Sequence, residues 1–166
     1  MREMNPQRLV HLLATNELRI RTGVLEVPVE TLGSESNIAV SLEVGFRDVC
    51  KWKVSVTPLR HEHLAITWQS IIEDLVSCVR DMSVPGFCVW ISGIDVLLAA
   101  IPFEDRKQFW SFFRNTFRQS RGLLLSLPAA ATNLLPAEER TLWIDYRRLS
   151  VWTYGASDGQ PGKYEP

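Results

Sequence analysis

The sequence contains few of the residues that build disulfide frameworks and metal centres. Only three of its 166 residues are cysteine and three are histidine. Cys50, Cys78 and Cys88 are far apart, and none belongs to a Cys-x-x-Cys pair. An odd number of isolated cysteines argues against a disulfide framework and against a zinc site. Because free thiols suit a reducing compartment, we expect a cytoplasmic protein.

Long hydrophobic runs are absent as well. No stretch approaches the roughly 18 consecutive apolar residues of a membrane span. Residues 1–19 mix charges with a short apolar run, unlike a signal peptide. We therefore expect no membrane partner. The net charge of −1 also argues against polyanion binding by bulk charge, so a nucleic-acid site would need a local basic patch.

The motifs of nucleotide binding and of serine catalysis are missing from the sequence. Neither GxxxxGK[ST] nor GxGxxG occurs. The only small-residue turn after an early predicted strand, 31–36, has no lysine, and its Glu35 would repel phosphate. A GxSxG nucleophile elbow is absent too. We therefore predict no cofactor and assign no catalytic residue.

Two groups of polar residues were weighed as metal or nuclease sites. His61 and His63 are two residues apart and would diverge by about 160° on a helix, whereas a helical metal pair needs i, i+4 spacing. We interpret them as a solvated first helical turn. Four charged residues also lie near one another: Glu43, Asp48, Lys51 and Lys53. Their spacing matches no nuclease pattern, so we interpret them as surface charge and predict no metal site.

The composition is that of a globular protein, with 46% hydrophobic and 22% charged residues. We predict a single α/β domain over residues 1–152. The remaining residues, 153–166, are rich in glycine, proline and charge, and are predicted to form a disordered C-terminal tail.

The hydrophobic pattern alternates between helical and strand periods. Helices are predicted over 5–14, 59–80, 96–101, 103–120 and 136–144, and strands over 18–27, 52–56, 87–91, 122–127 and 149–152. Residues 36–46 have period two, yet we favour a helix there. Strands 87–91 and 122–127 are wholly apolar, as in a parallel sheet covered on both faces. The order predicts a three-layer, Rossmannoid domain with a mostly parallel central sheet.

The segment FCVWISGIDVLLAAIPFEDR, residues 87–106, resembles the Walker B region of P-loop ATPases of the RecA, AAA and STAND type. In those families an apolar strand ends in paired acidic residues, followed by an apolar residue, an aspartate and a leucine-rich turn. A helix and a second apolar strand follow in those families, and the apolar segment 122–127 corresponds to that second strand here. The similarity covers about residues 86–128 and implies a P-loop NTPase-like fold.

This chain departs from the family pattern at the chemical positions. Ser92 and Gly93 stand where the paired acids would be, and only Asp95 matches a family acid. Without the Walker A lysine and these acids, little remains to hold Mg²⁺ or to orient water. The resemblance therefore implies a degenerate, non-hydrolysing relative. The alternative is that the similarity is accidental and that Asp95 is the N-cap of the following helix.

The predicted helix 103–120 and the residue that follows it carry a candidate binding surface. At 100° per residue, four cations fall within an arc of about 60°: Lys107, Arg114, Arg118 and Arg121. The aromatic residues Phe109, Trp110, Phe113 and Phe117 occupy a neighbouring arc, which is predicted to face the core. A basic stripe of this kind suits a phosphate backbone or an acidic partner, although it is also typical of a plain solvated face.

Three functional hypotheses follow from these observations. The preferred one is a non-catalytic interaction or assembly subunit that self-associates or binds a protein partner, such as an ATPase or a DNA-processing or defence complex. The second is a nucleic-acid-binding module that uses the four cations of the stripe. The third is an enzyme whose site is assembled from scattered residues such as His61, His63, Asp95 and Asp145.

Overall fold

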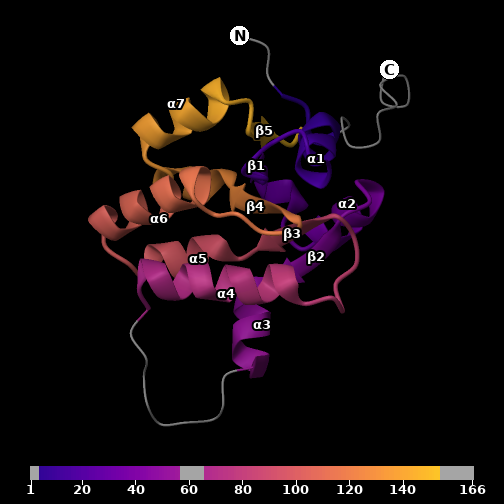
Figure 1. Ribbon diagram of the computed structural model, residues 1–166. Helices are drawn as coiled ribbons and strands as arrows, with labels where there is room; N and C mark the ends of the chain where they lie inside the picture. The colour runs from indigo at the N-terminus through magenta and orange to yellow at the C-terminus, as the bar shows by residue number, and fades with distance from the viewer. Residues whose placement is uncertain (1–3, 57–65, 154–166) are drawn as a thin grey trace.

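The computed structural model describes residues 4–56 and 66–153. Within them, five strands form one sheet in the order β2-β3-β4-β1-β5, and every neighbouring pair is parallel (Figure 1). The strands are β1 (Thr22–Val27), β2 (Gly45–Asp48), β3 (Cys88–Ser92), β4 (Gly122–Pro128) and β5 (Leu149–Val151). This sheet confirms the predicted α/β class and the parallel strands.

Helices cover both faces of the sheet (Figure 1). The helices are α1 (Pro6–Ala14), α2 (Glu35–Ser41), α3 (Val49–Val56), α4 (Trp68–Arg80), α5 (Ile94–Ala99), α6 (Phe103–Asn115) and α7 (Ala137–Asp145), with short 3-10 helices η1 (Val29–Thr31) and η2 (Ala129–Leu134). The buried residues of α1 and α2 belong to one hydrophobic cluster, and those of α3 to α7 belong to another on the opposite face. The molecule therefore has three layers.

The central strands are apolar throughout because side chains on both faces are covered. In β3, Val89 and Ile91 pack in the cluster of α3 to α7, whereas Cys88 and Trp90 pack in the cluster of α1 and α2. The same alternation divides the leucines of β4 between the two clusters. Successive side chains of a strand point to opposite faces, so a strand between two helical layers has no solvent-facing positions.

Aromatic side chains join α6 to α7. Phe109, Trp110 and Phe113 are fully buried, which confirms the predicted aromatic face. The rings of Trp110 and Phe113 lie 6.2 and 5.6 Å from the ring of Trp143 in α7. The indole N–H of Trp110 also donates to the carbonyl of Leu134, at 2.9 Å, so this polar atom is satisfied inside the core.

The predicted strand 52–56 is wrong, because residues 49–56 form the helix α3. Asp48 ends β2, and its Oδ1 atom accepts hydrogen bonds from the amides of Cys50 and Lys51, at 2.9 and 3.1 Å. This carboxylate satisfies amides that a helix start leaves open, and it starts the helix despite the β-branched residues that follow.

Other boundaries also differ from the predictions. Residues 36–46 divide between the helix α2 and the start of β2, and β1 begins at Thr22 rather than at residue 18. The helix α6 ends at Asn115, because the Thr116 and Phe117 amides close its last turn on the Phe112 carbonyl. The early part of the predicted helix 59–80, and the predicted tail beyond residue 153, lie outside the described residues. In the described part of the chain, no helix has the length and apolar character needed to cross a membrane.

Candidate functional site at the carboxyl edge of the sheet

The connections that follow the neighbouring strands β1 and β4 lie on opposite faces of the sheet. After β1 the chain enters η1 and α2, whereas after β4 it enters η2 and α7, which pack on the other face (Figure 1). Open parallel sheets bind ligands in the crevice that such a reversal leaves beyond the carboxyl ends of the strands. The topology therefore directs attention to this edge.

A hollow of about 340 Å³ lies at this reversal, and we refer to it as the switch-point hollow. It is lined by residues from the carboxyl ends of β1 to β4 and by the turn at 32–36. The residues predicted as a degenerate Walker B region, Ser92, Gly93 and Asp95, all line it. The structure thus brings them together with Gly33 and Glu35 of the turn after β1.

The end of β3 has a tight local geometry. Gly93 precedes α5 with a φ of +85°, a left-handed conformation that favours glycine. A Cβ atom at this position would lie 3.0 Å from Oδ1 of Asp48, so the absent side chain also allows a close approach between β2 and β3. Asp95 lies in the first turn of α5 and Gly93 occupies the N-cap position, so the alternative placement of Asp95 as the N-cap is wrong.

Carboxylates outnumber cations in the switch-point hollow. Glu35, Asp48 and Asp95 line it together with one ammonium group, that of Lys51. The Gly33 amide donates to Oε1 of Glu35 at 2.6 Å, and Asp48 accepts from the two amides that begin α3. Three backbone amides that an anion could otherwise use, those of Gly33, Cys50 and Lys51, are therefore occupied by the chain's own acids.

The thiol of Cys50 lies beside this hollow. Its Sγ atom donates to the Gly93 carbonyl at 3.3 Å. Burial raises the pKa of Cys50, and the nearby carboxylates of Asp48 and Asp95 raise it further. The thiol is therefore kept protonated at neutral pH, which makes it a poor nucleophile.

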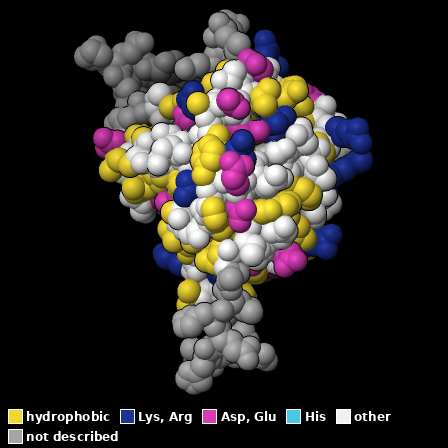
Figure 2. All heavy atoms as spheres, turned by 90° about the vertical axis from the view of Figure 1, so that its left-hand side faces the viewer, with side chains coloured by type: hydrophobic (Ala, Val, Ile, Leu, Met, Phe, Trp, Pro, Cys, Tyr) yellow, Lys and Arg dark blue, Asp and Glu magenta, His cyan; other side chains and the backbone are white. Residues whose placement is uncertain are grey.

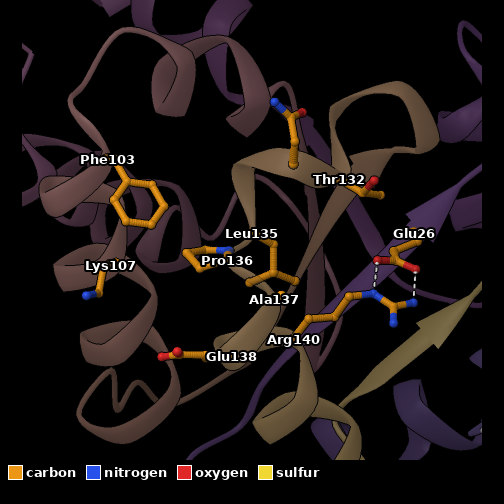
Figure 3. A pocket seen from close by; sticks show the side chains of 10 residues that line it. Glu26, Phe103, Lys107, Thr132, Leu135, Pro136, Ala137, Glu138 and Arg140 are labelled. Carbon is orange, nitrogen blue, oxygen red and sulfur yellow. Dashed lines mark hydrogen bonds and ion pairs between the residues drawn. The ribbon is translucent and has the colours of Figure 1, made fainter.

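A larger hollow of about 740 Å³ opens between η2, the start of α6 and the start of α7, and we refer to it as the α6–α7 hollow. Figure 3 shows apolar groups of Phe103, Leu135 and Pro136 in it. The charged side chains of Lys107 and Glu138 also line it. The ammonium of Lys107 lies 5.8 Å from the centre of the Phe103 ring.

One buried ion pair lines the α6–α7 hollow. Both carboxylate oxygens of Glu26 accept hydrogen bonds from the guanidinium of Arg140, at 2.7 and 2.8 Å (Figure 3). Only 8% of the Glu26 side chain is exposed, whereas 39% of the Arg140 side chain is exposed. Glu26 is not among the residues predicted from the sequence, although a single acidic residue within the apolar strand GVLEV is a usable signal.

The four predicted cations do not form one exposed stripe. Arg114 is buried and forms a two-pronged ion pair with Glu139, at 2.8 and 3.1 Å. Arg121 is also buried, and Lys107 and Arg118 alone of the four are exposed. The stripe is wrong for two reasons. Arg114 lies within α6 but is buried in its ion pair with Glu139, and α6 ends at Asn115, so Arg118 and Arg121 do not continue its helical spacing.

The scattered residues of the enzyme hypothesis are not assembled in the described structure. Asp95 lines the switch-point hollow, whereas Asp145 is exposed in the last turn of α7. His61 and His63 lie outside the described residues. Asp48 and Lys51 do reach the switch-point hollow, although the sequence analysis interpreted them as surface charge. Across residues 4–56 and 66–153, no group of three or more His, Cys, Asp or Glu side chains could hold a metal ion.

Apolar side chains are exposed in several segments at the carboxyl edge. Val29 and Leu32 follow β1, Val96 lies in α5, and Phe103 begins α6. Figure 2 looks onto the side of the molecule on which α4 and α6 begin, and there hydrophobic side chains are interspersed with acidic and basic ones. Comparison with known proteins adds no assignment to this surface: no family model matches the chain, and no curated protein is significantly similar to it.

Proposed function

We propose that this chain is a non-catalytic binding subunit with a degenerate P-loop NTPase-like core, and that its carboxyl edge binds a protein rather than a nucleotide. The proposal is carried by one observation. At the switch-point hollow, Glu35 accepts from one backbone amide of the turn after β1, and Asp48 accepts from two amides at the start of α3.

The placement of two turns supports the P-loop-like core. In P-loop ATPases the Walker A loop and the Walker B aspartate contact the same Mg²⁺–nucleotide complex, so both must meet at one point of the sheet. Here the turn 32–36 after β1 and the segment Ser92–Asp95 after β3 line the same hollow. The segment that resembles Walker B is therefore a neighbour in space of the turn that follows the first strand, which is where a Walker A loop would stand in a P-loop fold.

The electrostatics of the hollow disfavour a nucleotide. A triphosphate would meet three carboxylates and only one lysine. It would also have to displace Glu35 from the Gly33 amide, to which this carboxylate is bonded at 2.6 Å. Because like charges repel strongly at short distance in a partly buried site, such binding would be unfavourable.

The neighbouring α6–α7 hollow has the character of a protein-binding surface. Its wall is largely apolar, and Phe103 is 53% exposed at its edge. Aromatic side chains of this kind commonly act as anchors in protein interfaces. The buried carboxylate of Glu26 is already paired with Arg140, so it is poorly placed to act as a general base.

Light scattering coupled to size-exclusion chromatography of the pure chain, with and without ATP·Mg²⁺, tests the non-catalytic part of the proposal. We expect the molar mass, the elution volume and the thermal midpoint to be unchanged by ATP·Mg²⁺. Tight ATP binding with release of phosphate by the pure chain would overturn the proposal.

A photoreactive amino acid at position 103 tests the binding surface. Illumination of the cells that make the protein should join this position to one protein, either a partner or a second copy of the chain. The matched control carries the same group at Val40 of α2, which is 75% exposed on the opposite face of the sheet. Equal cross-linking at both positions would contradict a binding surface at Phe103.

A further inference from the structure

Four arginines line a hollow of about 930 Å³ at the amino edge of the sheet, opposite to the proposed protein-binding edge. They are Arg19, Arg21, Arg80 and Arg118. Glu17 is the one acidic residue among the described residues that line it. We refer to this feature as the arginine hollow. It gives a chain of net charge −1 a strongly basic local surface.

The arginines come from three connections that are distant in the sequence. Arg19 and Arg21 lie between α1 and β1, Arg80 is the last residue of α4, and Arg118 lies between α6 and β4. In a parallel α/β sheet the connecting helices run back along the strands and end at the amino edge. The residues that follow each helix therefore gather at this edge, whatever their separation along the chain.

Two of the four arginines already have structural partners. Arg21 donates to the carbonyls of Thr15, Gln119 and Ser120, and Arg80 donates to Oε1 of Gln119 at 3.2 Å. The Thr15 carbonyl is at the C-terminus of α1, where cations are favoured, and the other acceptors belong to the connection between α6 and β4, so these bonds give both arginines a structural role.

Arg19 and Arg118 have no structural partner of this kind. Both are exposed, and neither forms a hydrogen bond or an ion pair with any residue that the structure describes. Glu17 also lines the hollow but forms no ion pair with either arginine among the described residues, and its Oε1 atom lies 3.8 Å from Nε2 of His11. Two guanidinium groups are therefore free to bind an anion in a hollow to which two further arginines add positive charge.

We propose that the arginine hollow binds the phosphate backbone of a single-stranded nucleic acid. Guanidinium groups match phosphate oxygens with two parallel hydrogen bonds, and phosphodiesters supply a regular series of such groups. The site is concave, and the backbone of a flexible single strand can adapt to a positively charged groove of this kind.

An exposed aromatic side chain at the same edge supports a nucleic-acid ligand over an acidic peptide. Phe87 precedes β3 and is 76% exposed, and its carbonyl accepts a hydrogen bond from the Gly122 amide at the start of β4. Phe87 does not itself line the arginine hollow. Every base of a single strand has a face that stacks on such an exposed ring, whereas a run of Asp and Glu residues has none. This site is independent of the proposed protein-binding edge and differs from the predicted stripe, of which only Arg118 takes part.

Fluorescence anisotropy of a labelled oligothymidylate tests the proposal with the full chain. Affinity should fall with salt with a log–log slope of about −2, as expected for about three phosphate contacts. The double variant Arg19→Gln/Arg118→Gln should bind at least about tenfold more weakly, with a slope reduced by about 1.4. Phe87→Ala should lose about tenfold through lost stacking. The control Arg8→Gln/Arg147→Gln removes two exposed cations that do not line the hollow and should retain the wild-type affinity.

Circular dichroism and thermal unfolding show whether each variant is folded, so a loss of binding is not confused with unfolding. The proposal is overturned if the Arg19/Arg118 variant binds as well as the wild type or if the control loses as much. Displacement of the oligonucleotide by an equal concentration of polyglutamate would instead identify an acidic protein as the ligand. Displacement by low millimolar inorganic phosphate would reduce the site to one for a single anion, and tighter binding of a duplex would exclude the single strand.

Discussion

Two buried arginines of this protein have structural roles that their charge alone does not indicate. Arg121 donates five hydrogen bonds, at 2.6 to 3.2 Å, to the carbonyls of Val79, Asp81, Val84 and Gly86. It thereby satisfies the last carbonyls of α4 and holds the connection to β3. From the sequence, the same residue is indistinguishable from a solvated cation, because its acceptors lie about 40 positions away.

Arg148 is a second buried cation, and burial lowers its pKa to about 10. Its guanidinium donates to the Thr22 carbonyl at 2.7 Å and to the Arg114 carbonyl at 3.0 Å, and it lies 4.6 Å from the Trp143 ring. These contacts join β1, α6 and α7 at one residue. A cation is kept in the core here because carbonyl oxygens and an aromatic face replace its water.

The buried thiols predict how stability depends on alkaline pH. Burial raises the pKa of Cys88 from 9.0 to about 12. Above pH 9 the unfolded chain loses a proton that the folded protein keeps, so the free energy of unfolding falls as the pH rises towards 12. The loss from this thiol is at most about 1.4 kcal/mol per pH unit.

Urea unfolding between pH 8 and about pH 11 measures this dependence. Cys88→Ala lacks the thiol and should show a shallower fall of unfolding free energy over this interval than the wild type, whatever its stability at neutral pH. All other ionisable groups are shared by the two proteins, so identical slopes would refute the assigned pKa shift.

At the scale of secondary-structure elements, a single capping side chain overrides the strand preference of the residues that follow it. The β-branched run at 52–56 favours a strand by propensity, yet the Asp48 carboxylate starts α3 there. Asp48 preceding a short apolar run is a readable N-cap signal, and the sequence analysis did not use it. The strands β3 and β4 could be predicted without any capping signal, because a short, wholly apolar segment is typical of a buried parallel strand.

The packing of α1 on β4 gives a prediction for Gly122. A Cβ atom there would overlap the Leu13 carbonyl oxygen of α1, which is backbone and cannot move by itself. Gly122→Ala should lower the free energy of unfolding by about 2–3 kcal/mol, as expected for an overpacked core. Urea unfolding monitored by tryptophan fluorescence measures this change.

Gly23→Ala is the matched control for that substitution. It adds the same methyl group to the neighbouring strand β1, but its nearest contact, at 2.9 Å, is the flexible end of the Leu13 side chain. We expect a cost below about 1 kcal/mol, because that side chain can shift. Equal costs at the two glycines would show that the approach of the α1 backbone to β4 does not limit stability.

At the scale of the whole molecule, the parallel sheet separates two surfaces of opposite character. All strand ends lie at one edge, where the switch-point hollow contains three carboxylates. All strand starts lie at the other edge, where four arginines gather. The switch-point hollow at one edge is thus acidic and the arginine hollow at the other is basic, which allows one molecule to hold a protein and a nucleic acid at the same time under the two proposals.

Amide hydrogen exchange should show a gradient of stability across the molecule. The central strands β1, β3 and β4 are buried on both faces and should exchange only through global unfolding. In α3 only Val49 is buried and Val54 is 80% exposed, so its amides should exchange through local opening, at least about tenfold faster. Protection of α3 equal to that of β4 would contradict this distribution of stability.

The sequence by itself determined the α/β class, the parallel sheet, the apolar strands β3 and β4, and the aromatic face of α6. These features follow from periodicity and burial within short segments, and such information is local. The degenerate P-loop interpretation and the functional hypotheses also came from sequence, and they remain proposals.

Only the tertiary structure decided where charged groups lie and which of them are available. It placed Glu26 beside Arg140, removed Arg114 and Arg121 from the predicted basic stripe, and brought Arg19 to the same hollow as Arg118. The physical reason is that charge pairing and desolvation depend on distances between residues far apart in the chain. Those distances are set by the order of the strands and by the edge at which each connection ends, which no local pattern records.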